Sequence, residues 1–509
     1  MAWSTGLGLT ALGVYTHQLP LLYIGYAGLG GIGWGLGYIS PVSTLLRWFP
    51  DRRGMAAGLA LTAFGGGAML ATPINEFLLN TFFELPAYLG PLDSVNLITE
   101  AGKRFADVGG VLREVVVAAP SDVNNLPGSP SPGVYLVGTG NSGAAKTFLT
   151  LSLGYLVSMN IGAFMQRVPA ETWLPPNWTP PSEHHRQNKM ISHRNVHHAQ
   201  ALKTPQFYLL WTSVAGFATS GVSVLSCAKT MMSDIFATAM PAVVTGAFAA
   251  SFVAALSAGN MVGRFLWSSV SDITGRKNTY FLFGLSVPVL CLLPHVTQMV
   301  VSEPGWLPLS VFYGSTMLTV SFYGGVFSVL PAYISDIFGQ KHVGAIHGRL
   351  LTAWSAAALI GPNLLTNLRE QSYEQSVIDL ASKVDSSLFQ HTFGAPISEL
   401  STLMASKTVT IPLLMQIVPQ GTLDPTPTLY NTTLYSMAAL ATIAIASNAL
   451  LGPVHSKHHM PEAPRARHDH AHHHSHNSSF QQHHASIHVV GNSSAGNTTQ
   501  PNVDRCSKH

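Results

Sequence analysis

The sequence predicts an all-α polytopic membrane protein, a bundle of about ten membrane-spanning helices in two pseudo-symmetric halves. First, charged residues make up 10% of the 509-residue chain, against about 25% in an ordinary soluble domain. Second, uncharged blocks such as PAVVTGAFAASFVAALSAGNMVG (Pro241 to Gly263) have the length that an α-helix needs to cross the roughly 30 Å hydrocarbon core. Third, one pattern of glycines and small residues occurs twice, once early and once late in the chain.

Ten stretches are long and apolar enough to be the expected helices. They lie near residues 2–16, 20–46, 54–79, 147–167, 206–227, 243–267, 279–298, 307–333, 344–366 and 433–452. Several contain Gly and Pro, which membrane helices tolerate better than soluble ones do. The chain opens directly in an apolar stretch without a charged leader, so we expect no signal peptide.

Lys and Arg residues gather in short loops between these stretches. WFPDRRG (Trp48 to Gly54), TGRKN (Thr274 to Asn278) and the polar stretch from about 168 to 204 fall on one side if the spans alternate. Positive residues favour the cytoplasmic side, so we expect these loops in the cytoplasm, with the plasma membrane as the favoured membrane. The slight positive balance then requires no nucleic-acid partner. Three cysteines, few and odd in number, imply no disulfide framework.

The chain divides into four parts by composition. We expect a first helical bundle, a central cytoplasmic loop, a second bundle of six helices and a disordered, His-rich cytoplasmic tail; these are residues 1–169, 170–203, 204–452 and 453–509. Both bundles carry a polar insertion on the outer side, 80–145 and 368–432, which we expect to be mostly irregular.

Histidines are dense in two places, the tail and the central loop. The loop cluster consists of His184, His185, His193, His197 and His198. Histidines at this density can bind zinc, copper or nickel weakly or titrate near neutral pH. Without cysteines or a fixed spacing they define no metal site, and a low-complexity tail is the favoured interpretation.

The repeated pattern consists of GMAAGLALTAF (Gly54 to Phe64) and GAIHGRLLTAW (Gly344 to Trp354), with Pro41 and Pro331 at equal distances ahead. Each copy leaves one helix, crosses a short loop and enters the next helix. Parallel halves related by an axis along the membrane normal fit this arrangement.

The two halves differ in what precedes the repeat. The second half has well over a hundred residues before Pro331, whereas the first has about forty before Pro41. By this comparison two helices are missing from the front, so that ten of an original twelve remain. A truncated gene model or an isoform is the favoured explanation, and a genuine ten-helix protein is the alternative.

WFPDRRG together with TPQFYLLW (Thr204 to Trp211) resembles the oxalate/formate antiporter family of the major facilitator superfamily. GNMVGRFLWSSVSDITGRKN (Gly259 to Asn278) and the segment from Tyr323 to Pro362 extend the resemblance over most of the membrane part, but not over the insertions or the tail. The resemblance implies a major-facilitator-like bundle and a secondary transporter of small carboxylate anions, working by alternating access and exchange. It implies no cofactor, and its expected partners are the lipid bilayer and a small organic anion.

Arg264 is the principal candidate for substrate binding. It lies eight positions before Asp272, about 12 Å into the helix, where a charged group is expensive and normally faces the bundle interior. A guanidinium offers a planar fork that suits a carboxylate. The alternative is an arginine that snorkels back to the interface. The family resemblance favours the first interpretation, because family members place a substrate-binding arginine at this point.

Aromatic candidates come from the resemblance. It implies that Tyr38, Tyr323, Phe327 and Trp354 line a central cavity and stack around the anion; lipid-facing or core packing is the alternative for each. Oxalate-exchanging members carry a lysine where this chain has Trp354, so a single carboxylate suits this chain better than two. The missing first helix can hold another cation, which leaves the substrate open.

Asn260 bears on how transport is coupled. It stands four residues before Arg264, where related proton-coupled carriers have an aspartate. An amide takes no proton, which argues against proton symport.

A conformational latch is expected in SDITGRK (Ser271 to Lys277). Asp272 near Arg276 and Lys277 can form a charge relay that holds one conformation closed. The alternative is an ordinary positive loop on the cytoplasmic side.

Two other functions stay open from the sequence. One is a carrier for a different small organic solute, and the other is a carrier-derived membrane protein that transports nothing. We expect no enzyme, since we find no nucleotide loop, no metal-ligand set within the spans and no nucleophile with a base.

Overall fold

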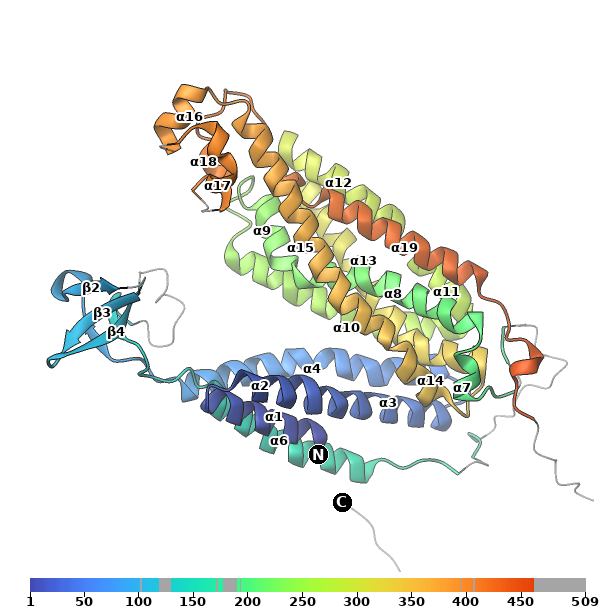
Figure 1. The fold of residues 1–509 in the computed structure, drawn as a ribbon. Coiled ribbons are helices and arrows are strands. Elements are labelled where there is room, and N and C mark those ends of the chain that lie inside the picture. The colour runs from blue at the N-terminus through green and yellow to red at the C-terminus, as the bar shows by residue number, and fades with distance from the viewer. Residues whose placement is uncertain are drawn as a thin grey trace, which may run out of the picture. The chain divides into compact units, whose positions relative to one another are not determined.

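The computed structural model describes residues 1–100, 103–118, 130–170, 173–176, 190–192, 194–393, 395–405 and 408–461. Among these residues, nine helices are long and apolar enough to cross a membrane, and a shorter helix, α1 (Ala2–Tyr15), precedes them (Figure 1). Helices therefore cover all ten predicted spans, and the expectation of an all-α polytopic membrane protein is confirmed.

The first half consists of α1 and five further elements. These are α2 (Leu19–Leu22), which continues through a π-helical segment η1 (Tyr23–Gly30) into α3 (Gly31–Trp48), then α4 (Arg53–Phe82) and α6 (Ala144–Met165). Glycines let α1 and η1 pack backbone to backbone: a Cβ on Gly6 would lie 2.6 Å from the Gly25 carbonyl oxygen. Small residues allow such close backbone packing in membranes, where burial of apolar side chains provides no driving force for helix association.

The second half is built around α13, whose middle turns are almost completely buried. Its elements are α7 (His198–Ala201), α8 (Pro205–Ser226), α9 (Ala228–Phe236), α10 (Gly246–Thr274), α11 (Arg276–Phe283), α12 (Ser286–Ser302), α13 (Trp306–Phe338), α14 (Val343–Leu350), α15 (Thr352–Ala381) and α19 (Asn431–Leu450). Short 3-10 turns complete the chain as η2 (Leu92–Ser94), η4 (Ile397–Glu399), η5 (Thr426–Thr428) and η6 (Ser456–His458).

The sequence repeat is also a repeat of secondary structure. α3 ends at Trp48 and α4 begins at Arg53, while α13 ends at Phe338 and α14 begins at Val343. These four positions are equivalent in the two copies. The copies differ further on, because α4 runs unbroken whereas a turn at Leu351 separates α14 from α15.

The expectation that the first outer insertion is irregular is wrong. It forms a five-stranded antiparallel sheet in the order β1-β5-β4-β3-β2. The strands are β1 (Tyr88–Gly90), β2 (Leu97–Glu100), β3 (Lys103–Val108), β4 (Val111–Ala118) and β5 (Gly133–Leu136). Gly109 and Gly110 both have positive φ, 67° and 85°, as a tight hairpin turn requires. Ala106, Val115 and Val134 form the core of the sheet.

The second outer insertion is helical, and the expectation of an irregular segment is wrong there too. α15 continues to Ala381, and three short helices follow: α16 (Ser386–Phe393), α17 (Leu400–Ala405) and α18 (Ile411–Leu414). Phe389 and Ile411 belong to the same buried cluster as Met231 of the bundle. Apolar contacts therefore hold this insertion on the second half.

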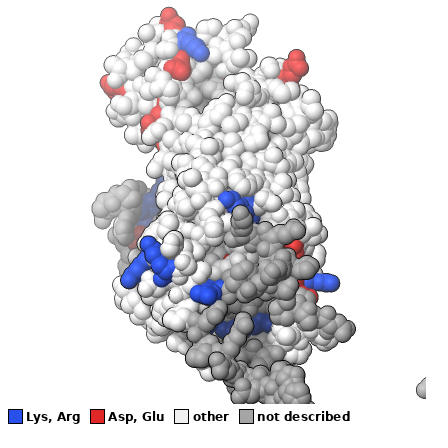
Figure 2. All heavy atoms as spheres, turned by 90° about the vertical axis from the view of Figure 1, so that its right-hand side faces the viewer, with Lys and Arg blue, Asp and Glu red and all other residues white. Residues whose placement is uncertain are grey.

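Basic side chains gather at one end of the bundle, which we call the basic end and define by the segments 47–53, 275–277 and 339–349. The described Lys and Arg residues there are Arg47, Arg52, Arg53, Arg276, Lys277, Lys341 and Arg349. Figure 2 shows such side chains over the lower part of the face that looks to the right in Figure 1, with several acidic ones near its top. A cluster of this kind is what the positive-inside rule predicts for a cytoplasmic end.

Candidate functional site

A cavity of about 350 Å³ lies between α3 and α4 of the first half and α10, α13, α14 and α15 of the second. Its lining includes all five residues that the sequence suggested for substrate binding, namely Arg264, Trp354, Tyr323, Phe327 and Tyr38. The structure thus brings these side chains together, and their role in binding stays a prediction.

Arg264 is buried, with 7% of its surface exposed. Its Nε donates to the Asn260 side-chain oxygen at 2.9 Å, and its Nη1 donates to the Leu61 carbonyl at 3.4 Å. Among the described residues no carboxylate lies within ion-pair distance of the guanidinium. A buried cation without a counter-ion is costly, so the cavity favours an anion at this point.

Two glycines make room for this arginine. A Cβ on Gly65 of α4 would lie 3.1 Å from the Arg264 Nε, and a Cβ on Gly324 of α13 would lie 3.2 Å from its Cγ. Larger residues at these positions would force the side chain to move. Within the AFGGGA segment, Gly65 therefore leaves room for the charged side chain of Arg264.

Aromatic rings form the remaining walls of the cavity. Trp34 and Phe64 are stacked, with centroids 5.8 Å apart, and Trp34 also meets Trp354 edge to face at 5.6 Å. Phe327 meets Trp354 at 5.9 Å and Tyr323 at 5.3 Å. The Trp354 Nε1 donates to the Tyr323 hydroxyl at 3.3 Å. Rings from both halves therefore surround one space.

The sequence reasoning missed Trp34 and Phe64 as parts of this site. A signal for Phe64 was present, because it holds the position in the first copy of the repeat that Trp354 holds in the second. The guanidinium of Arg264 lies 5.6 Å from the centroid of the Phe64 ring, within the range of cation–π attraction. Trp34 has no counterpart in the repeat, and only the packing of α3 places it here.

His347 is a buried histidine that the sequence did not single out. It is 1% exposed, its ring lies 5.8 Å from the Tyr38 ring of the other half, and its Nε2 has no hydrogen-bond partner among the described residues. It does not line the cavity.

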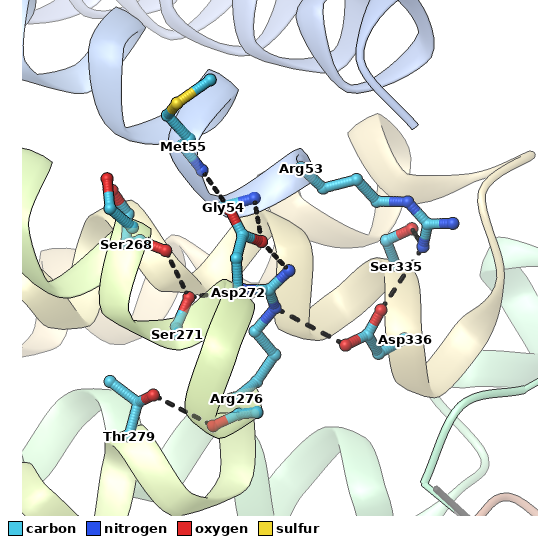
Figure 3. Close-up of polar contacts among 12 residues, drawn as sticks. Arg53, Gly54, Met55, Ser268, Ser271, Asp272, Arg276, Thr279, Ser335 and Asp336 are labelled. Carbon is cyan, nitrogen blue, oxygen red and sulfur yellow. Dashed lines mark hydrogen bonds and ion pairs between the residues drawn. The ribbon is translucent and has the colours of Figure 1, made fainter. Parts of the chain in front are cut away.

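Asp272 joins the two halves at the basic end (Figure 3). Its carboxylate accepts the backbone N–H groups of Gly54 at 2.9 Å and Met55 at 2.8 Å. These are among the first N–H groups of α4, which have no partner within the helix and carry partial positive charge. Arg276 donates to the same carboxylate at 2.5 Å, and Gly275, at φ 84°, makes the turn between the two residues.

A second acidic residue adds to the contacts around Asp272. Asp336, in the last turn of α13, lies 3.6 Å from Arg276 and 3.4 Å from Arg53 of the first half. Arg53 also donates to the Ser335 hydroxyl at 3.2 Å. The sequence reasoning missed Arg53 and Asp336, because nothing in the local pattern shows that they meet.

Lys277, which the sequence grouped with Asp272 and Arg276, makes its described contacts elsewhere, and a latch formed by the other two stays a prediction. Its Nζ donates to the carbonyls of Ala449 at 3.0 Å and Leu451 at 2.6 Å, at the end of α19. The last carbonyls of a helix lack internal partners and attract cations. Lys277 therefore stabilises a contact within the second half.

Three imidazoles, His197, His198 and His342, cluster where α7 meets the start of α14, with ring centroids 4.1 to 5.6 Å apart. Burial, and then the neighbouring histidines, lower the pKa of His342; burial, His197 and Arg349 lower the pKa of His198. Within the described ranges, no group of His, Cys, Asp or Glu is arranged to hold a metal ion. The remaining loop histidines and the tail from residue 462 onward lie outside those ranges.

Comparison with known proteins gives no matching family model but several relatives. Apicoplast pyruvate carrier 1 of Toxoplasma gondii is 24% identical over 68% of this chain and 59% of its own length. The oxalate:formate antiporter of Oxalobacter formigenes is 24% identical over 70% of this chain and 65% of its own. The MFS-type transporter YhjX of Escherichia coli is 20% identical over 67% of this chain and 64% of its own. The chain thus spans less than two thirds of the length of each of these relatives.

The helices, the repeat and the cavity between the halves define an all-α polytopic membrane protein of the major-facilitator type. More particularly, the chain is similar to the oxalate:formate antiporter and to the other relatives named above. The resemblance drawn from the sequence is therefore confirmed.

Proposed function

We propose that the chain is a secondary transporter of small carboxylate anions, working by alternating access and exchange. The observation that carries the proposal is Arg264, a buried cation that lines the cavity between the halves without a described carboxylate beside it. Relatives that are called a pyruvate carrier and an oxalate:formate antiporter support the same class of cargo.

In this proposal the guanidinium binds the carboxylate and the two halves exchange access to it. An anion that reaches Arg264 replaces the missing counter-ion, so binding removes an electrostatic cost. The latch around Asp272 closes the basic end while the cavity is loaded from the opposite side. Its hydrogen bonds must break before the cargo can leave toward the basic end.

Exchange is favoured over proton symport by Asn260. This amide accepts the hydrogen bond from the Arg264 Nε at 2.9 Å, and it stays neutral at any physiological pH. An aspartate in its place would compete with the cargo for the arginine and would itself take up a proton.

Counterflow in proteoliposomes tests the proposal. Vesicles that hold this chain are loaded with unlabelled pyruvate, oxalate, lactate or formate, and uptake of the labelled anion is followed. We expect uptake with at least one anion and its near loss in Arg264→Lys, because an ammonium lacks the planar fork. Phe265→Ala is the matched control, since this neighbouring side chain is 42% exposed. Uptake that is the same in Arg264→Lys and in the wild type, or counterflow of sugars and not of anions, would contradict the proposal.

A further inference from the structure

We infer that the cavity takes a monocarboxylate with a flat apolar body, such as an aryl 2-oxo acid, in preference to a dicarboxylate. This inference rests on the proposed function, because it specifies the cargo of the same site. Three features of the cavity carry it: its charge, its walls and its size.

The charge of the lining fits one carboxylate. Arg264 is the one ionised side chain in the described lining, which contains no Lys, His, Asp or Glu. Tyr38 and Tyr323 line the same cavity as Arg264, and each carries a hydroxyl that can donate to a carboxylate. The Tyr323 oxygen accepts from Trp354 and keeps its own proton to donate. One fork and two hydroxyls suit the two oxygens of a single carboxylate.

The walls disfavour a second carboxylate. Beyond the arginine the cargo meets the rings of Trp34, Phe64, Phe327 and Trp354. Ring faces carry the negative part of the aromatic quadrupole, and a carboxylate buried against them would lose its hydration without a partner. A flat apolar group has the opposite preference, because it can stack on these rings.

The size of the cavity also favours a cargo larger than oxalate or formate. A volume of about 350 Å³ lies at the lower end of sites for organic ligands of drug-like size. Oxalate or formate would fill only a small part of it. A carboxylate paired with Arg264 directs its substituent away from the guanidinium, into the space that the rings enclose. An aryl group would therefore fill the volume that a small anion leaves empty.

Pyruvate and phenylpyruvate form a matched pair of probes, because they share the 2-oxo acid and differ by a phenyl group. In proteoliposomes that show counterflow of labelled pyruvate, phenylpyruvate should half-inhibit uptake at a concentration about 10-fold or more below that of unlabelled pyruvate, as burial of an aromatic side chain predicts. Oxalate should inhibit more weakly than either. In Trp354→Ala and Phe327→Ala the advantage of phenylpyruvate should shrink several-fold, whereas Phe265→Ala, on the exposed face of α10, should keep it.

The outcomes separate this inference from the proposed function. Pyruvate counterflow with equal inhibition by pyruvate and phenylpyruvate, or with oxalate as the strongest inhibitor, overturns the inference and leaves the carboxylate transporter standing. An advantage of phenylpyruvate that persists in both Trp354→Ala and Phe327→Ala overturns it as well. No counterflow of any carboxylate overturns the proposed function itself.

Discussion

Asp272→Asn should release the basic end of the bundle. The wild-type carboxylate accepts two backbone N–H groups from the start of α4 and pairs with Arg276. The amide keeps one acceptor oxygen and loses the charge. Its NH₂ group then faces the N–H donors of α4 and the guanidinium of Arg276, which adds repulsion. The closed conformation should therefore lose stability relative to the conformation that is open at this end.

The magnitude follows from these contacts. A hydrogen bond to a charged group contributes about 1.5–3 kcal/mol, and the Asp272 side chain is 19% exposed, so solvent screens part of its ion pair. Loss of one charge-assisted hydrogen bond and weakening of the pair should amount to about 2 kcal/mol. At 1.36 kcal/mol per factor of ten, this shifts the closed-to-open ratio by about 30-fold.

Spin labels can measure this shift. Leu59 on α4 and Ile273 on α10 are 54% and 89% exposed, so cysteines there accept labels after the three native cysteines are replaced. Pulsed electron resonance should show a short distance in the wild type and a longer, broader population in Asp272→Asn. Asp51→Asn is the matched control, because the Asp51 carboxylate lies 3.8 Å from Arg52 of its own half. The same distance distribution in Asp272→Asn as in this control would refute the latch.

Three further predictions follow from the same geometry. Asn260→Asp places a carboxylate beside Arg264, so counterflow should fall at neutral pH and recover as acid protonates it; equal loss at all pH values contradicts this. Gly54→Ala presses a Cβ on the α10 backbone and should open the basic end at a cost of about 1–3 kcal/mol, measured with the same labels. Gly67→Ala, with no atom within 4 Å of the added Cβ, should leave the distance unchanged. The folded state lowers the pKa of His342 and so binds fewer protons than the unfolded state. The stability of the folded state should therefore fall as the pH drops below about 6.5, and amide exchange in α7 should speed up; pH-independent local opening would exclude the effect.

The sequence alone determined the class of fold and the positions of its helices. Hydrophobic length is a local property, and a chain in lipid must satisfy its backbone hydrogen bonds within each segment. All ten expected spans are helical, and both copies of the repeat end and begin helices at equivalent positions. Arg264 could also be identified from the sequence, because a charged side chain deep in an apolar span normally faces the interior of the helix bundle.

The sequence-based expectation was wrong for the two outer insertions, because their average hydropathy does not reveal the secondary structure that they form. The first insertion is polar overall, yet its strands β3 and β4 pair around the Gly109–Gly110 turn and form part of a sheet. The second insertion is polar as a whole, yet Phe389 and Ile411 bury themselves against the bundle. Composition averaged over about sixty residues conceals both patterns.

Only the tertiary structure decided which side chains meet. Arg276 and Lys277 are neighbours in sequence, but successive residues on a helix point about 100° apart. One therefore faces the latch and the other caps α19. Asp336 meets Arg53, and Trp34 meets Trp354, through contacts between segments far apart in the chain. Such pairs depend on the rotation and depth of whole helices, which packing against the other half sets and which no local pattern of residues encodes.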